Sequence, residues 1–538
     1  MPRLALPPSL AWIALLAAAF ALPGLGHDPW KPLDAIGISI VSAMAAGGDG
    51  IVPRVAGVPW LYDPPLYHWV AAVFARVFSI VMEPLAATRL ASAAFVLAAL
   101  WLARAAARDW TAGEERAGAA AAAPLILLGS VGLVVRAHEA VPELAALAAL
   151  AGALAALPHA AARPTASGAA FGAGLGLAFL SAAWIAPAAL GVAVLAAHLA
   201  CAEWRSRSAL PFLSAASVVC AAVAASWPLA LAWRSPEQLA AWWSLASQPQ
   251  GALGANLRYY AVTGSWFAWP GWPLALWSAW ALRTRLAEPR LFVPAAATLL
   301  MFAGTAFWGP PQDVNLIAAL APLALLAAQG VSRLRRGAAA ALDWFGVMTF
   351  SFFAFLVWLA YVAMMTGVPP RLAKNFARQA PGLVTQFEPL AFALALALTL
   401  GWIAMVAFTA RGPTRGVLRW AAGVALLWGT FANLWMPWAD HQKSYRAVAL
   451  QLRSKIPVDA PCVAQKGLGV PQSAALDYHA GIRPRAFRVL NPGACPLLIV
   501  QGSPRHELDA PGAGWTKLAD VGRPGDKLER YRLYRLNR

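Results

Sequence analysis

Ionisable side chains gather in one polar segment between apolar runs, residues 27–65. Asp34 follows Trp-Lys-Pro-Leu in this segment, and a carboxylate at such a place can act as general base toward a hydroxyl group. Asp34 also suits the N-cap of a helix beginning at Ala35, because a carboxylate accepts hydrogen bonds from the first free N–H groups. Both interpretations remain open, with Asp34 as the candidate catalytic residue.

Three more residues of this segment are candidate ligands for a substrate. Asp28 can supply a second acid, although Asp before Pro is also a common turn former. Lys31 and Arg54 are cations that can bind a phosphate. Lone basic residues near a membrane surface also contact lipid headgroups with no further role.

A second polar group lies where two apolar segments meet, at His138, Glu139 and Glu143. Burying an ionisable group at the end of a membrane helix costs free energy, so a buried group there indicates a functional site. A group that faces the lipid headgroups costs little free energy and indicates nothing further. His138 and Glu143, together with Tyr67, complete the candidate substrate-binding residues.

Tryptophans near the predicted outer surface can stack on a sugar or form an interfacial belt, and the belt is the favoured interpretation. They are Trp242, Trp243, Trp266 and Trp269. The histidines are scattered, and no acids are paired at a spacing that demands a cation. No Walker loop or dinucleotide fingerprint occurs. We therefore expect no metal and no cofactor.

The elements that must position these residues are strongly apolar. The 538 residues are 60% hydrophobic and 12% charged, about half of the roughly 25% charge of soluble domains. About 20 apolar residues suffice to cross a bilayer, which excludes a soluble protein here. Such segments lie near 9–26, 83–103, 118–135, 139–157, 168–181, 184–200, 209–229, 266–282, 291–308, 313–330, 342–365, 387–409 and 417–436.

In a soluble protein the net charge of +18 would suggest binding to nucleic acid. Here the cations lie in short loops between apolar segments, and such loops are predicted to lie on the cytoplasmic side of the membrane. We expect contact with membrane lipids and no nucleic acid. These loops carry Arg205 and Arg207; Arg283, Arg285 and Arg290; Arg333, Arg335 and Arg336; Arg411, Arg415 and Arg419. They place 230–265, 366–386 and the chain after Pro437 outside.

Two segments admit alternatives. Residues 1–26 resemble a signal peptide with Arg3 before an apolar run, but no clear cleavage site precedes His27, so we expect a retained first helix. Residues 64–81 are apolar enough to cross, yet Arg76 and the aromatic start favour an interfacial helix. The prediction is an all-α polytopic membrane protein with about 13 transmembrane helices in residues 1–437, unless 168–200 form one long helix.

After Trp438 the apolar runs shorten to strand length: CVAQ, RAFRVL and CPLLIVQG, with PQSAALDYHAG as a helix and YRLYRL as an edge strand. This predicts a small α/β domain over 438–538. Cys462 and Cys495 both fall within it. The pair suggests a disulfide and so an oxidising compartment such as a periplasm.

The segment 27–72 resembles the first outer loop of bacterial GT-C glycosyltransferases, relatives of the protein O-mannosyltransferases and the lipid A aminoarabinose transferase. The resemblance continues through GAGLGLAFLSAAWIAP, WRSPEQLAAWW, YYAVTGSWFAWPGWPLALW, APLALLAAQGVSRLRRGAAAALDWFGVMTF and MPWADHQKSYR. It implies a transferase of the bacterial inner membrane with a periplasmic C-terminal domain. Such a transferase takes a sugar from a polyprenyl-phosphate donor and gives it to a lipid or glycan acceptor.

Several functional positions depart from that family. Its Asp-Glu pair after Trp-x-Pro reads Leu33-Asp34, its Glu-Lys-Pro-Pro reads Tyr62-Asp63-Pro64-Pro65, its Ser-Lys-Gly reads Ser181-Ala182-Ala183, its Asn-Asn-x-Gly-Arg reads Ser244-Leu245-Ala246-Ser247-Gln248, and its Arg-x-x-Tyr reads Gln312-Asp313-Val314-Asn315. An anionic phosphate in an apolar site needs cations or N–H donors. The losses motivate alternatives: a non-catalytic paralogue that binds lipid-linked sugar or a partner enzyme, or a partner subunit that supplies the missing charges. A transporter would need polar residues lining its spans, and these spans contain almost none.

Overall fold

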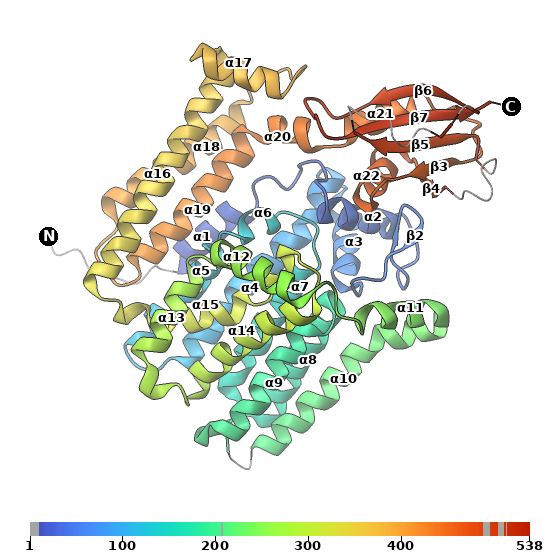
Figure 1. Ribbon diagram of the computed structural model, residues 1–538. Helices are drawn as coiled ribbons and strands as arrows, with labels where there is room; N and C mark the ends of the chain where they lie inside the picture. The colour runs from blue at the N-terminus through green and yellow to red at the C-terminus, as the bar shows by residue number, and fades with distance from the viewer. Residues whose placement is uncertain (1–9, 206–207, 488–494, 504–510, 513, 538) are drawn as a thin grey trace.

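The computed structural model describes residues 10–205, 208–487, 495–503, 511–512 and 514–537. Arg3, Arg207 and the end of the predicted strand RAFRVL lie outside these described residues. Figure 1 shows a helical body with a small sheet at one end of it.

Seven of the described helices are long and apolar enough to cross a membrane, which agrees with a polytopic membrane protein. They are α4 (Pro84–Trp110), α8 (Pro164–Ala182), α10 (Ala209–Arg234), α14 (Pro289–Trp308), α16 (Arg336–Thr366), α18 (Pro389–Phe408) and α19 (Arg415–Leu434). The apolar side chains of α10, α16 and α18 are largely exposed, as expected of helices that face lipid.

Shorter helices complete the body around a core of α4, α5, α7 and α15. They are α1 (Leu10–Ala21), α5 (Glu115–Leu128), α6 (Leu133–Arg136), α7 (Glu143–Ala156), α9 (Ile185–Ala200), α11 (Pro236–Ala246), α12 (Leu253–Phe267), α13 (Gly271–Ala281) and α15 (Leu320–Ala328). The helix is interrupted between α8 and α9, where Ala183 has φ 55°. The prediction of two helices over 168–200 is confirmed.

The outer segment forms α2 (Leu33–Ala45), a two-stranded ribbon of β1 (Arg54–Val55) and β2 (Val58–Pro59), and α3 (Leu66–Phe78). With 13 residues, α3 spans about 20 Å, less than the roughly 30 Å of a bilayer core. Arg76 of α3 donates to the carbonyls of Met44 and Ala45 at 2.8 and 2.9 Å. These carbonyls lie at the C-terminal end of α2, so the cation joins the two helices.

The remaining elements lie beyond α16. They are α17 (Pro370–Gln379), α20 (Met436–Lys443), α21 (Arg446–Arg453), β3 (Val463–Lys466), α22 (Val470–Ala480), β4 (Arg485–Ala486), β5 (Leu497–Gly502), β6 (Trp515–Val521) and β7 (Arg530–Leu536). The predicted boundary at 437/438 falls inside α20.

The five strands are ordered β4-β3-β5-β7-β6, with β3 parallel to β4 and β5, and β7 antiparallel to β5 and β6. β7 therefore lies inside the sheet, and the prediction of an edge strand for YRLYRL is wrong. Cys462 and Cys495 form a disulfide with Cα atoms 5.3 Å apart, which confirms the predicted pair. It joins the starts of the adjacent strands β3 and β5.

The sheet domain packs against the outer segment through α22. Ala474 is fully buried and Tyr478 half-buried against the apolar cluster of α2 and α3. In Figure 1, α22 lies between the sheet and α2. Residues more than 400 positions apart in the sequence thus meet at this end of the molecule.

Candidate functional site

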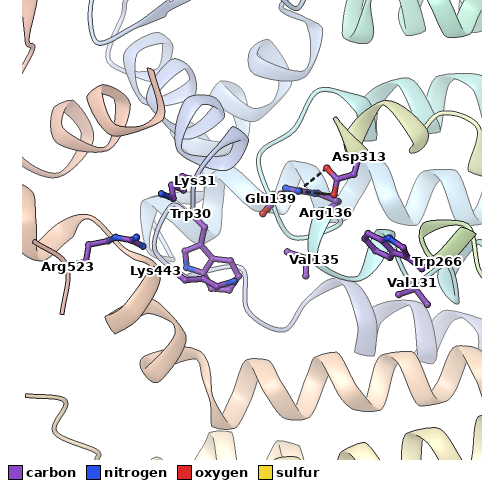
Figure 2. A pocket seen from close by; sticks show the side chains of 11 residues that line it. Trp30, Lys31, Val131, Val135, Arg136, Glu139, Trp266, Asp313, Lys443 and Arg523 are labelled. Carbon is purple, nitrogen blue, oxygen red and sulfur yellow. Dashed lines mark hydrogen bonds and ion pairs between the residues drawn. The ribbon is translucent and has the colours of Figure 1, made fainter. Parts of the chain in front are cut away.

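A polar cavity of about 450 Å³ lies where the outer segment, the 131–139 turn and the chain after α19 meet. Its lining carries four cations and two acids: Lys31, Arg136, Lys443 and Arg523 with Glu139 and Asp313. Trp30, Val131, Gly132, Val135 and Trp266 complete it. Figure 2 shows Lys31, Lys443 and Arg523 on one side, and Arg136, Glu139 and Asp313 on the other.

Trp30 forms the wall between the two sides. Its backbone N–H donates to Asp34 Oδ2 at 3.1 Å, and its indole Nε1 donates to Asp440 Oδ1 at 2.8 Å. The Lys443 ammonium lies 4.3 Å from the centre of the ring, a cation–π distance. The backbone N–H and the indole N–H of Trp30 are thus each held by a carboxylate.

Lys443 ends α20 and points into the cavity (Figure 2). Burial of part of its side chain lowers the pKa of Lys443. Among the described residues, no carboxylate lies within ion-pair distance of Lys443, in contrast to the other three cavity cations. Its charge is therefore available to an anion in the cavity.

Lys31 and Arg523 are both held by the segment that joins β6 to β7. Lys31 Nζ lies 2.5 Å from Glu529 Oε1. Arg523 pairs with Asp526 and lies 4.8 Å from the centre of the Tyr445 ring. Tyr445 in turn donates to Glu529 Oε2 at 2.6 Å. The sheet domain thereby contributes directly to the cavity.

Glu139 and Asp313 are the acids of the cavity lining, and both bind Arg136. Arg136 Nη1 lies 2.5 Å from Glu139 Oε2, and Nη2 lies 3.0 Å from Asp313 Oδ1. Burial raises the pKa of Glu139 to about 7, even though Arg136 opposes the shift. A carboxylate with that pKa can take up a proton near neutral pH.

Asp34 lies outside the cavity lining, fully buried beside Arg89. Arg89 Nη2 approaches Oδ2 at 2.7 Å, and the Ala140 N–H donates to Oδ1 at 2.8 Å. Burial opposes ionisation, but Arg89 and the donors outweigh it and hold the pKa of Asp34 below its usual value. The helix starts at Leu33 with Pro32 at the N-cap position, so the N-cap interpretation of Asp34 is wrong.

Of the other predicted outer-segment residues, Lys31 lines the cavity and two lie elsewhere. Asp28 pairs with Arg446 and lines a second cavity of about 390 Å³, to which α20 also contributes. Arg54 is exposed and donates to the Gly57 carbonyl at 3.1 Å.

The three remaining predicted ligands are buried away from the cavity lining. Tyr67 Oη lies 2.6 Å from Ser92 Oγ. The His138 ring stacks on Trp428 with ring centres 4.1 Å apart, and its Nε2 lies 2.7 Å from the Phe20 carbonyl. Glu143 begins α7 and keeps one buried oxygen without a hydrogen-bond partner among the described residues.

Of two substituted positions with acidic residues, Asp313 lines the cavity and Asp63 lies outside its lining. The segment in place of Arg-x-x-Tyr brings Asp313 into the lining, so an anion stands close to where the family has a cation. Asp63 accepts a hydrogen bond from Trp60 Nε1 at 3.3 Å, and burial raises the pKa of Asp63 to about 6.

Sequence reasoning missed Arg136, Glu139, Asp313, Lys443 and Arg523 as ligands. Glu139 is a member of the predicted group at His138, Glu139 and Glu143, and Arg136 adjoins this group. Lys443 belongs to the MPWADHQKSYR segment, so proximity to these segments was a usable signal. Arg523 carries no such signal. In the part of the chain that the structure describes, no group of three His, Cys, Asp or Glu side chains is placed to hold a metal ion.

Comparison with solved structures shows the fold. ArnT from Cupriavidus metallidurans bound to undecaprenyl phosphate superposes with TM-score 0.70 at 17% identity, over 98% of this chain and 97% of that chain. The apo state of that protein gives TM-score 0.70 at 18% identity over the same shares. The chain therefore has a GT-C class fold, as the resemblance predicted. No family model and no curated protein matches the sequence.

Proposed function

We propose that this chain is a membrane glycosyltransferase that moves a sugar from a polyprenyl-phosphate donor to a lipid or glycan acceptor. The observation that carries the proposal is the polar cavity beside Trp30, lined by Lys443 and the paired Glu139 and Arg136. The likeness to ArnT, a protein solved with bound undecaprenyl phosphate, supports the class of donor.

In this proposal the donor phosphate binds on the side of Lys31, Lys443 and Arg523. The acceptor oxygen bonds to the anomeric carbon while the bond from that carbon to the phosphate oxygen breaks. The electron pair leaves with the phosphate, whose charge Lys443 stabilises. Glu139 takes the acceptor proton, since its raised pKa suits a general base near neutral pH. Glu139 and the predicted base Asp34 are each paired with an arginine, but Glu139 lines the cavity and Asp34 does not.

We further propose that the cavity lies on the periplasmic side of the membrane. About 13 crossings in residues 1–437 would put the cavity and the sheet domain of residues 438–538 on the periplasmic side of a bacterial inner membrane. The disulfide of Cys462 and Cys495 supports an oxidising compartment for this domain.

The test is sugar transfer in proteoliposomes with a panel of labelled polyprenyl-phosphate sugars. Wild type is compared with Glu139→Gln, and with Glu237→Gln as a matched control, because Glu237 lies on α11 outside the cavity. Transfer by wild type and the control but not by Glu139→Gln supports the proposal. Equal transfer by all three removes Glu139 from the mechanism.

A second candidate is a non-catalytic paralogue that binds lipid-linked sugar or a partner enzyme, and a separate observation favours it. Leu33 stands where the family has the first acid of its pair, and the remaining acid, Asp34, is held by Arg89. Binding of polyprenyl phosphate without turnover of any donor in the panel would favour this function over transfer.

A further inference from the structure

Helix α17 lies across the ends of α16 and α18 in Figure 1, on the side of the sheet domain. Both long helices carry exposed apolar side chains, such as Phe352 at 56% and Leu390 at 73%. Surfaces of this kind contact acyl chains in a bilayer. A helix across their ends therefore lies near the level of the lipid headgroups.

The two faces of α17 differ in chemistry. Leu372 and Phe376, four residues apart, are half-buried and face inward. The Phe376 ring packs against Trp435 and Trp438, with ring centres 4.9 and 6.0 Å away. This aromatic packing holds the helix against the junction of α19 and α20.

The outer face carries Arg371, Lys374 and Arg378, all exposed. Their spacing of three and four residues places them on one side of the helix. The helix contains no acid, and within the described residues no carboxylate lies in ion-pair distance of the three. The polar contact of Arg378 is with the Asn375 side chain at 2.8 Å.

The C-terminal end of α17 is fixed to the cavity elements. The Gln379 carbonyl accepts from Gln442 Nε2 at 3.0 Å, and the Pro381 carbonyl lies 3.0 Å from His441 Nε2. Gly525, at φ 73°, approaches so closely that a Cβ atom there would lie 2.2 Å from the Gln379 carbonyl oxygen. The helix is thus held in place, and its cations are presented together.

We propose that the basic face of α17 binds the headgroups of anionic phospholipids in the adjoining leaflet. Three cations with no ion-pair partner in the described chain meet negative phosphates, while Leu372 and Phe376 turn toward the protein. Each such cation strengthens binding to an anionic surface by about fivefold. The surface is separate from the donor cavity, so the inference does not depend on the proposed transfer.

The test is a titration of the full-length protein in detergent with dioctanoyl phosphatidylglycerol, followed by native mass spectrometry. Dioctanoyl phosphatidylcholine serves as the neutral lipid. The variant Arg371→Gln/Lys374→Gln/Arg378→Gln is compared with the control Arg453→Gln/Lys455→Gln/Arg535→Gln, which removes three exposed cations elsewhere. We expect the α17 variant to lose at least about tenfold in affinity for phosphatidylglycerol, and the control to match wild type.

Equal loss in the two variants would overturn the proposal, because net charge rather than α17 would then govern binding. Equal affinity for the two lipids in wild type would overturn it as well. Inorganic phosphate is added as a competitor: weak competition up to millimolar concentration supports a lipid site, whereas full displacement points to a free-phosphate site instead. Since all six residues are exposed, unchanged thermal unfolding of each variant is the check on folding.

Discussion

Asp34 and Arg89 form an ion pair in which both side chains are completely buried, with Arg89 Nη2 2.7 Å from Asp34 Oδ2. Arg89 also donates to the carbonyls of Leu25 and His27 at 2.8 and 2.5 Å. The pair thereby joins α4 to the two ends of the segment that carries Trp30. It positions this segment and does not face the cavity.

Removing one partner of this pair should lower the free energy of unfolding of the protein. Either Arg89→Met or Asp34→Ala leaves the remaining charge buried without a partner, at a cost of about 3–5 kcal/mol. The thermal unfolding midpoint in detergent measures the loss, and the double variant Asp34→Leu/Arg89→Met should recover part of it. An Asp34→Ala protein with the wild-type midpoint and no sugar transfer would instead identify Asp34 as the catalytic base.

Sugar transfer should depend on the ionisation of Glu139. Burial raises the pKa of Glu139 to about 7, so the base form is scarce below that pH. The turnover rate is therefore expected to rise tenfold per pH unit below about pH 7 and to level off above it. The pH profile in proteoliposomes, at saturating donor, checks this. A flat profile from pH 5 to 9 would exclude Glu139 as the base.

Lys443 should govern the affinity for the donor, and the turnover rate as well, because in the proposed transfer it stabilises the charge on the departing phosphate. Lys443→Met keeps an apolar stem against Trp30 but removes the charge, and a hydrogen bond to a charged group is worth about 1.5–3 kcal/mol. We expect the KM for the donor to rise roughly 10- to 100-fold. Lys455→Met, exposed beyond α21, is the control. An unchanged KM in Lys443→Met would place the phosphate elsewhere.

Gly37 sets the spacing between α2 and the turn that carries Glu139. A Cβ atom at Gly37 would lie 1.9 Å from the Ala140 carbonyl oxygen, so backbone would have to move. Gly37→Ala should cost about 1–3 kcal/mol in stability and reduce transfer, because Glu139 adjoins Ala140. Gly118→Ala, with open space around its Cβ position, should be neutral or slightly stabilising. Equal midpoints for the two variants would contradict this account of Gly37.

The sequence predicts the helical frame well, because the length of an apolar run depends on local composition. The expected span 387–409 corresponds to α18 at Pro389–Phe408. Strand order is less local: β7 has alternating apolar and basic residues, as an edge strand has. Its Arg530 and Arg532 are instead paired with Asp520 on β6 at 2.8 and 3.1 Å, a partner that only the folded sheet brings near.

The cavity is harder to predict for the same reason. Lys31 was expected from its loop, but Lys443 and Arg523 reach the cavity from positions more than 400 residues later in the sequence. Arg89 offered an unused signal, since an arginine in an apolar span needs a buried partner. With Asp34 as that partner, its carboxylate becomes a structural group.

Arg523 and Glu529 follow every apolar span in the sequence, yet Glu529 pairs with Lys31 of the first outer segment and Arg523 lines the same cavity as Lys31. Synthesis proceeds from the N-terminus, so the membrane helices can insert long before these two residues emerge. The cavity is thus the last part of the molecule to be assembled. A chain interrupted before residue 523 would possess its full set of membrane helices and still lack one wall of the site. Quality control that monitors only membrane insertion would not detect the defect.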